Sequence, residues 1–149
     1  MPLSGFCFIY PLLGDKLGSR QVKRLKFRAI CENHLYSKAY SKGKRAVTRL
    51  LAVYVLPDYA AERLRRAHPQ KKRVNRIGLT VTKKLGGAVT RNRTKRILRE
   101  AYRAVQKEYR IKTGYLVVIA AREAATTAKS TEIARDLTYA LGKLNLLAS

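Results

Sequence analysis

Acidic residues are scarce in this chain, and their scarcity limits the chemistry that the polypeptide can perform. Only nine Asp and Glu accompany 33 Lys and Arg in 149 residues, which gives a formal net charge of +24. Metal-dependent cleavage of phosphodiesters requires clustered carboxylates that hold the ions. The nine acids are scattered over different segments without a D-x-D or E-x-x-H pattern, and no Ser/His/Asp order stands out. We therefore expect no catalytic residue in the polypeptide, which disfavours a protein-only nuclease.

Cysteine and histidine are also rare, which argues against a metal-stabilised scaffold. The two cysteines, Cys7 and Cys31, form no C-x-x-C pair, and the two histidines, His34 and His68, are isolated in the sequence. This spacing does not match that of structural zinc sites. We expect reduced thiols in the cytoplasm, and the sequence identifies no protein-bound metal site.

Long hydrophobic runs are missing as well. The apolar stretch at residues 3–13 is interrupted by Gly5 and Pro11, lacks a basic leader and is too short to span a bilayer. A degenerate signal peptide is the minor alternative. We expect residues 1–24, which show no periodicity, to be a flexible N-terminal extension, and residues 25–149 to form one domain.

Positive charge is abundant, and it coexists with enough apolar residues to build a core. Hydrophobic residues make up 46% of the chain, which excludes a disordered basic tail. A net charge of this size destabilises a compact state by self-repulsion. A folded domain that tolerates it usually binds nucleic acid, because neutralised phosphates release counterions. Solubility and an anionic membrane are the alternatives, and the clustering of the charge favours nucleic acid over both.

The spacing of apolar residues predicts alternating helices and strands. Steps of three and four indicate helices, whereas alternation or short continuous apolar runs indicate strands. The predicted elements in chain order are a helix at residues 29–42, strands at 47–56 and 77–82, a helix at 90–109, a strand at 115–121 and a helix at 131–145. Residues 58–73 are predicted to be a charged connection with at most one helical turn, near 60–66. One small sheet with helices packed against it buries these apolar faces.

Gly86 and Gly87 precede an amphipathic helix that carries cations on one side. At about 100° per residue, the apolar third of its circumference holds Ile97, Leu98, Ala101, Ala104 and Val105. The opposite side holds Asn92, Lys95, Arg96, Arg99 and Arg103, with Arg91 and Arg93 at its margins. Cations four residues apart repel one another in an isolated helix, so a binding face for a polyanion explains them better than a solvated surface does. Thr90 is the expected N-cap.

Further cations and three tyrosines extend this candidate surface. Lys83 and Lys84 come shortly before the glycines, Tyr36 and Tyr40 share a face of the first predicted helix, and Tyr54 lies on the following strand. Tyrosines beside cations can stack unpaired bases without demanding a sequence. On pattern alone, they are equally well explained as core residues with their hydroxyls at the rim. A helix committed to a sheet is poorly suited to be a free DNA-recognition helix, so RNA is the expected partner.

Residues 76–96 resemble the signature of a known family, the protein subunit of bacterial ribonuclease P. The segment Arg91-Asn92-Arg93 is similar to the family's arginine–asparagine–arginine motif, and the pattern continues through Lys95, Arg96, Arg99 and Glu100. The spacing of the family's first helix and first strand is matched upstream by Tyr36, Tyr40, Gly43, Arg49 and Tyr54. Residues 113–122 resemble the strand that follows, and the likeness covers about residues 27–146.

The resemblance implies an α+β fold, an α/β sandwich in which a small mixed sheet contains a left-handed βαβ crossover. General rules of connection favour the right-handed form. The resemblance also implies that a partner RNA, with Mg²⁺, cleaves precursor tRNA at the mature 5′ end. The residues expected to contact RNA are Lys83, Lys84, Arg91, Asn92, Arg93, Lys95, Arg96, Arg99 and Arg49. A cleft for the single-stranded 5′ leader would be lined by Tyr36, Tyr40 and Tyr54. Neither DNA nor a membrane is an expected partner.

The chain departs from the family pattern at three places. Tyr36 and Tyr40 stand where the family often has phenylalanine, and stacking survives that change. Thr48 stands where an asparagine commonly precedes the matched arginine, which removes one expected polar contact. The charged insertion at residues 60–72 is longer than the typical hairpin. A ribosomal or other structural-RNA-binding protein without a role in cleavage is the alternative function, because size and charge fit it equally.

Overall fold

The computed structural model describes residues 28–70 and 75–148 of the chain. Its helices are α2 (Asn33–Lys42), α3 (Tyr59–Ala67), α4 (Ala88–Glu108) and α5 (Ser130–Lys143), with the short 3-10 turns η1 (Lys83–Leu85) and η2 (Glu123–Thr126). Its strands are β1 (Arg28–Ala29), β2 (Lys44–Val47), β3 (Leu51–Pro57), β4 (Arg76–Thr80), β5 (Arg110–Ile111), β6 (Tyr115–Ala121) and β7 (Leu147–Ala148). The predictions for residues 1–24, including Cys7, concern residues outside these ranges.

Five strands form a mixed sheet in the order β1-β4-β6-β3-β2. β4 and β6 are parallel neighbours that the chain joins through α4, whereas β3 is antiparallel to β6 and forms a hairpin with β2. β6 is the continuous apolar run of the sequence, and its central place explains why both of its faces are apolar. A short second sheet pairs β5 with β7. The α+β class and the parallel pair are confirmed, and the handedness of the crossover stays a prediction.

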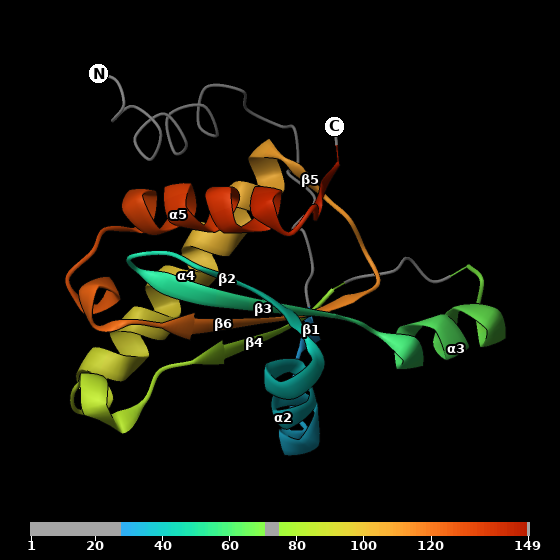
Figure 1. Ribbon diagram of the computed structural model, residues 1–149, viewed down its shortest axis with the longest axis horizontal. Helices are drawn as coiled ribbons and strands as arrows, with labels where there is room; N and C mark the ends of the chain where they lie inside the picture. Colours follow the sequence, from blue (N-terminus) through green and yellow to red (C-terminus); the bar gives the residue numbers. More distant parts are fainter. Residues whose placement is uncertain (1–27, 71–74, 149) are drawn as a thin grey trace, which may run out of the picture.

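One face of the sheet is closed by α4 and α5, and we call it the closed face (Figure 1). Its strand positions alternate with those of the other face, as pleating requires, and include the fully buried Val53, Val117 and Ile119. The apolar stripe of α5 packs onto them with Ile133, Leu137 and Leu141. The main core of the protein therefore lies on this side of the sheet.

Among the described residues, α2 is the one helix that crosses the opposite face, which we call the open face (Figure 1). Leu35 and Ala39 of α2 pack on Leu56, Leu116 and Val118 of the sheet, which makes a second and smaller apolar cluster. α2 covers only part of this face. Strand residues beyond it, such as Thr80 and Ala120, stay partly accessible to solvent.

The first predicted helix and the first predicted strand need correction. The helix begins at Asn33 and not at residue 29, because Arg28 and Ala29 pair with Arg76 and Ile77 of β4 as strand β1. The strand predicted at 47–56 is two strands separated by a tight turn, in which the Leu51 N–H donates to the Thr48 hydroxyl at 3.2 Å. β2 was missed because it is a short edge strand with charged residues.

Two further predictions differ from the structure. The charged connection after β3 contains α3, a helix of nine residues and not a single turn. Its alanines, its early Glu62 and its late arginines favour a helix. The N-cap of α4 is Gly87 and not Thr90, since the helix begins at Ala88. Among the described residues, no helix is long and apolar enough to cross a membrane.

Candidate RNA interface

The cationic side of α4 faces solvent along the length of the helix. Asn92, Arg93, Arg96, Arg99 and Arg103 are exposed, whereas Arg91 and Lys95 are half-buried. The opposite side is buried against the sheet and α5 through Leu98, Ala101, Ala104 and Val105, as predicted, and also through Thr94 and Tyr102. One helix therefore fills the core with one side and presents a row of positive charge with the other, which we call the α4 ridge (residues 91–103).

The turn before α4 adds two lysines to the start of the ridge. Lys83 and Lys84 are exposed in η1, which packs against α4. Gly86 has φ +137°, a conformation that L side chains rarely adopt, and a Cβ there would lie 3.1 Å from the Thr90 Cβ. This glycine lets the chain reverse closely onto the first turn of the helix. Lysines and the positive end of the helix dipole then meet at one place.

Tyr36, Tyr40 and Tyr54 come together on the open face, and we call them the tyrosine cluster. The Tyr40 ring packs edge-on against Tyr54 with centroids 4.7 Å apart. The Tyr40 hydroxyl donates to the Thr80 hydroxyl at 2.9 Å. The Tyr36 ring lies directly over Gly78, where a Cβ would be 2.5 Å from the ring. These contacts join α2, β3 and β4 in one aromatic site.

The floor beside the tyrosine cluster is made of small residues. Sheet pairing places Ala52, Ala120 and Thr80 side by side on the open face, next to the row that contains Tyr54 and Gly78. Tyr40 is 39% exposed at this site. Small residues beneath partly exposed rings leave room for flat groups, so the arrangement can stack unpaired bases. Tyr36 and Tyr54 also pack against the small apolar cluster beneath α2, so the three rings are partly covered and partly accessible.

The Tyr36 hydroxyl remains protonated over the physiological range. Burial raises its pKa above the ordinary value, and the neighbouring Tyr40 and Cys31 raise it further. The neutral hydroxyl donates to the Ile30 carbonyl oxygen at 3.3 Å. Tyr36 therefore adds an uncharged ring to the tyrosine cluster, and positive charge has to come from elements around the cluster.

The tyrosine cluster and the α4 ridge lie on opposite faces of the sheet but meet at one end of it. β4 ends at Thr80, which holds the Tyr40 hydroxyl, and the chain reaches Lys83 of η1 three residues later. The α4 helix starts at this same end, as Figure 1 shows. An RNA strand that leaves the ridge can therefore enter the aromatic site without crossing the sheet.

Arg49 is the one candidate residue that lies apart from both groups. It is exposed in the turn between β2 and β3, where it lines a hollow with η2 and α5 residues that include Glu132 and Asp136. The Leu50 N–H donates to the Asp136 carboxylate at 3.2 Å. The structure thus gives Arg49 acidic neighbours, unlike the residues of the α4 ridge.

Gly78 and Thr80 are site residues that the sequence analysis missed. Gly78 makes room for Tyr36, and Thr80 fixes Tyr40. A glycine inside a predicted strand is a signal for close approach by another group, so Gly78 could have been found. The hydrogen bond of Thr80 depends on the path of α2 across the sheet, and no local pattern reports it.

Comparison with known proteins identifies the relatives of this fold. A family profile described as Ribonuclease P matches residues 25–145. The ribonuclease P protein component of Alkaliphilus oremlandii is 33% identical over 118 residues, which cover 79% of this chain and 91% of that protein. The chain belongs to the ribonuclease P protein family. The corresponding component of Dehalococcoides mccartyi is 42% identical over 83 residues, which cover 56% of this chain and 66% of that protein.

A solved structure supports the fold of this ribonuclease P protein. The RNase P protein of Staphylococcus aureus superposes with a TM-score of 0.64 at 24% identity, over 83% of this chain and all of that chain. Membership of the family makes the protein the RNA-binding subunit of ribonuclease P, a tRNA-processing endoribonuclease. It decides against the alternative of a ribosomal protein. An RNA partner is established with it, and the α4 ridge supplies the charge that such a partner requires.

Proposed function

We propose that this subunit holds the 5′ leader of precursor tRNA on the tyrosine cluster while the α4 ridge lies against the catalytic RNA. The cations lower the repulsion between two polyanionic RNAs, and the aromatic site keeps the leader beside the bond that is cut. The polypeptide contributes position and charge, and the RNA contributes the catalytic groups. Precursor tRNA is the substrate, and the cytoplasm is the proposed compartment.

The observation that supports leader binding is the convergence of three tyrosines beside the start of the α4 ridge. Each aromatic ring offers a face that stacks any base, which suits leaders of differing sequence. The α4 ridge is suited to a different task, since arginines bind phosphates in a bidentate manner. The proposal assigns its exposed Asn92, Arg93, Arg96 and Arg99, with Arg91, Lys95, Lys83 and Lys84, to the RNA subunit.

Magnesium is assigned to the RNA side of the complex. Within residues 28–70 and 75–148, no three His, Cys, Asp or Glu side chains lie close enough together to hold a metal ion. We propose that the Mg²⁺ of the holoenzyme is held mainly by ligands that the RNA provides.

Reconstitution tests the proposed function directly. Purified protein is mixed with a bacterial ribonuclease P RNA and a precursor tRNA at moderate Mg²⁺, and 5′ cleavage is compared with and without protein. The protein should raise the rate of cleavage, and it should release no leader in the absence of the RNA. Cleavage by the protein alone, after removal of all nucleic acid, would overturn the proposal.

A pair of variants at Tyr40 separates stacking from hydrogen bonding. Tyr40→Ala removes the ring and should weaken binding of precursor tRNA while leaving mature tRNA unaffected. Tyr40→Phe loses only the hydrogen bond to Thr80 and should retain most of the preference for the precursor. Equal losses of affinity for precursor and mature tRNA in Tyr40→Ala would contradict binding of the leader by the tyrosine cluster.

A further inference from the structure

A second concave site lies on the open face, on the far flank of α2 from the tyrosine cluster. It is a pocket of about 270 Å³ between α2 and the beginning of α3, and we call it the α3 pocket. Lys38 of α2, together with Tyr59 and Arg63 of α3, lines it above the apolar Leu56 and Leu116 of the sheet. The pocket exists because the connection after β3 continues as the helix α3.

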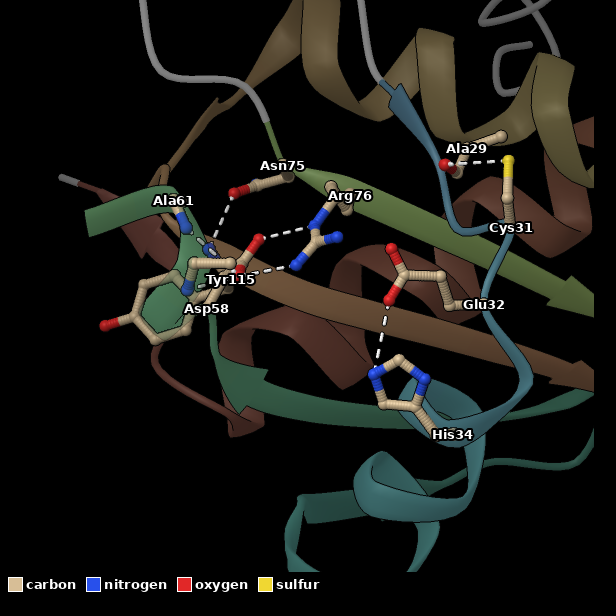
Figure 2. Close-up of polar contacts among 10 residues, drawn as sticks. Ala29, Cys31, Glu32, His34, Asp58, Ala61, Asn75, Arg76 and Tyr115 are labelled. Carbon is tan, nitrogen blue, oxygen red and sulfur yellow. Dashed lines mark hydrogen bonds and ion pairs between the residues drawn. The ribbon is translucent and has the colours of Figure 1, made fainter. Parts of the chain in front are cut away.

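The start of α3 is held firmly against the sheet. The Asp58 carboxylate accepts hydrogen bonds from the backbone N–H groups of Ala60 and Ala61, at 3.1 and 3.2 Å, which caps the helix. The same carboxylate accepts two hydrogen bonds from Arg76 of β4, at 2.6 and 2.7 Å (Figure 2). Asp58 is buried and Arg76 is partly accessible, so the first turn of α3, with Tyr59, has a fixed place at the edge of the pocket.

Basic side chains outnumber the acids around the α3 pocket. The Glu32 carboxylate lies 3.2 Å from the His34 ring, Asp58 pairs with Arg76, and Glu62 pairs with Arg65. Among the described residues, this leaves Lys38, Arg63 and Arg66 without a carboxylate partner. The pocket and the exposed side of α3 are therefore positively charged. This charge fits a polyanion better than it fits a protein surface that has few acidic residues.

The aromatic ring of the pocket is available to a ligand. Tyr59 is 66% exposed, although the preceding Asp58 is buried. The Lys38 ammonium lies 5.8 Å from the centre of its ring. A solvent-exposed ring beside cations can stack a base while the cations bind the adjoining phosphate. The α3 pocket thus offers an aromatic ring for stacking, as the tyrosine cluster does, and it also contains its own cations.

The two sites are separated by a single helix. At about 100° per residue, Tyr36 and Tyr40 lie on one flank of α2, and His34 and Lys38 lie on the other. An α-helix with its side chains is about 10–12 Å across. The residues between the flanks include the exposed and small Ser37 and Ser41, so a single strand can pass over α2. α3 lies at the end of the sheet opposite the start of α4 (Figure 1).

We propose that the α3 pocket binds leader nucleotides farther from the cleavage site than those on the tyrosine cluster. A base stacks on Tyr59, and its phosphate is bound by Lys38 and Arg63. The strand runs from the α4 end of the sheet, through the tyrosine cluster and over α2, to α3. This inference rests on the proposed function, since it assumes that the tyrosine cluster holds the nearer part of the leader.

Leader length is the variable that tests this inference. The holoenzyme is assembled with a bacterial ribonuclease P RNA, and its dissociation constant is measured, with cleavage blocked, for precursor tRNAs whose leaders grow by single nucleotides. Tyr59→Ala and Arg63→Gln are compared with Tyr139→Ala and Lys143→Gln, which change an exposed tyrosine and an exposed basic residue on α5. Tyr40→Ala reports the tyrosine cluster in the same series.

We expect affinity to rise in two steps as the leader grows. Tyr59→Ala and Arg63→Gln should remove only the second step, and Tyr59→Ala should weaken binding of the longest leaders about five-fold or more, the equivalent of one lost base stack. The α5 variants should match the wild type at every length. A single early step, or equal losses for long leaders, short leaders and mature tRNA, would overturn the inference.

The series also separates this inference from the proposed function. If the first step is present and Tyr40→Ala removes it, the tyrosine cluster binds the leader whether or not a second step follows. If affinity does not depend on the leader at any length in the wild type, the proposed function and the inference both fail.

Discussion

The two faces of the five-stranded sheet differ in what covers them and in what they leave accessible. On the closed face, α4 and α5 bury a continuous core that includes Ile119 and Leu141. On the open face, α2 is the one helix within the described part of the chain that crosses the strands, with aromatic and cationic sites on either flank. The comparison teaches that one side of the sheet supplies stability and that the other can therefore stay incomplete and bind a ligand. Five measurements test this division.

The largest effect is expected from a cavity on the closed face. Ile119 is fully buried between α4, α5 and the neighbouring strands. Ile119→Ala should lower the free energy of unfolding by about 2–5 kcal/mol, as measured by urea denaturation. Tyr40→Ala on the open face should cost less than about 1 kcal/mol, because the ring is exposed. Similar losses for the two variants would contradict the division between the faces.

The ion pair that holds α3 should give the next largest effect. Asp58→Asn leaves Arg76 without its partner, and we expect a loss of about 2–3 kcal/mol, below the cost of a fully buried pair because Arg76 still reaches solvent. Unfolding of this variant by urea at neutral pH measures the loss. Glu62→Gln breaks the exposed pair with Arg65 and should change stability far less.

The contribution of Asp58 should also depend on pH in a defined direction. Burial opposes ionisation of this carboxyl, but hydrogen bonds from Arg76, Ala61 and Ala60 outweigh it, so its pKa lies below the ordinary value. A lowered folded-state pKa means that the stabilisation is complete above the unfolded pKa of about 3.9. It is lost as the pH falls through the lowered folded-state value. The difference between wild type and Asp58→Asn should shrink over that acidic range, and a constant difference would contradict the assignment.

A smaller effect on binding is expected from a substitution under the tyrosine cluster. Gly78→Ala places a methyl group 2.5 Å from the Tyr36 ring, which has to move. Affinity for precursor tRNA should fall by about 1–3 kcal/mol, the range for one stacked base, while affinity for the catalytic RNA stays unchanged. Gly142→Ala is the matched control, because a Cβ there makes only an ordinary 3.7 Å contact with Leu147. Equal losses for the two RNAs would show that the substitution acts on the fold.

The smallest expected effect on stability is a gain and not a loss. Arg99 lies four residues from both Lys95 and Arg103 on the α4 ridge, so Arg99→Gln should stabilise the free protein by a few tenths of a kcal/mol. The same variant should weaken binding of the catalytic RNA and make the slope of log K against log salt shallower by about one. Denaturation and a salt titration measure the two effects. An unchanged slope would remove Arg99 from the RNA interface.

The sequence predicts the closed face better than the open one. The apolar stripe of α4 and the apolar run of β6 can be recognised in the local sequence, because their apolar residues follow the pattern of the element that they belong to. β1 and β2 escaped prediction because they are short edge strands, and the pairing of β1 with β4 also joins residues far apart in the chain. The length of α3 depends on Asp58, whose role as a cap becomes visible only when Arg76 is placed beside it.

The candidate site shows the same limit. The resemblance supplies the tyrosines and the cations, and helical spacing places the cations on one side of α4. Spacing alone could not place Tyr54 against Tyr40, or Tyr36 over Gly78, because those contacts depend on how α2 crosses the sheet. The α3 pocket was invisible for a similar reason, since Lys38 and Tyr59 belong to different elements.

Strand β4 sets the spacing of three supports on the open face. Its alternate residues Arg76, Gly78 and Thr80 serve in turn the cap of α3, the seat of Tyr36 and the anchor of Tyr40. Equivalent positions along a strand recur about every 6.6 Å, so the three supports lie at fixed intervals along β4. Slippage of this one strand by a single residue would turn all three away together. A ligand along the open face therefore meets supports whose spacing is fixed by one strand. Natural variation that changes one support has to keep the number of residues between the supports.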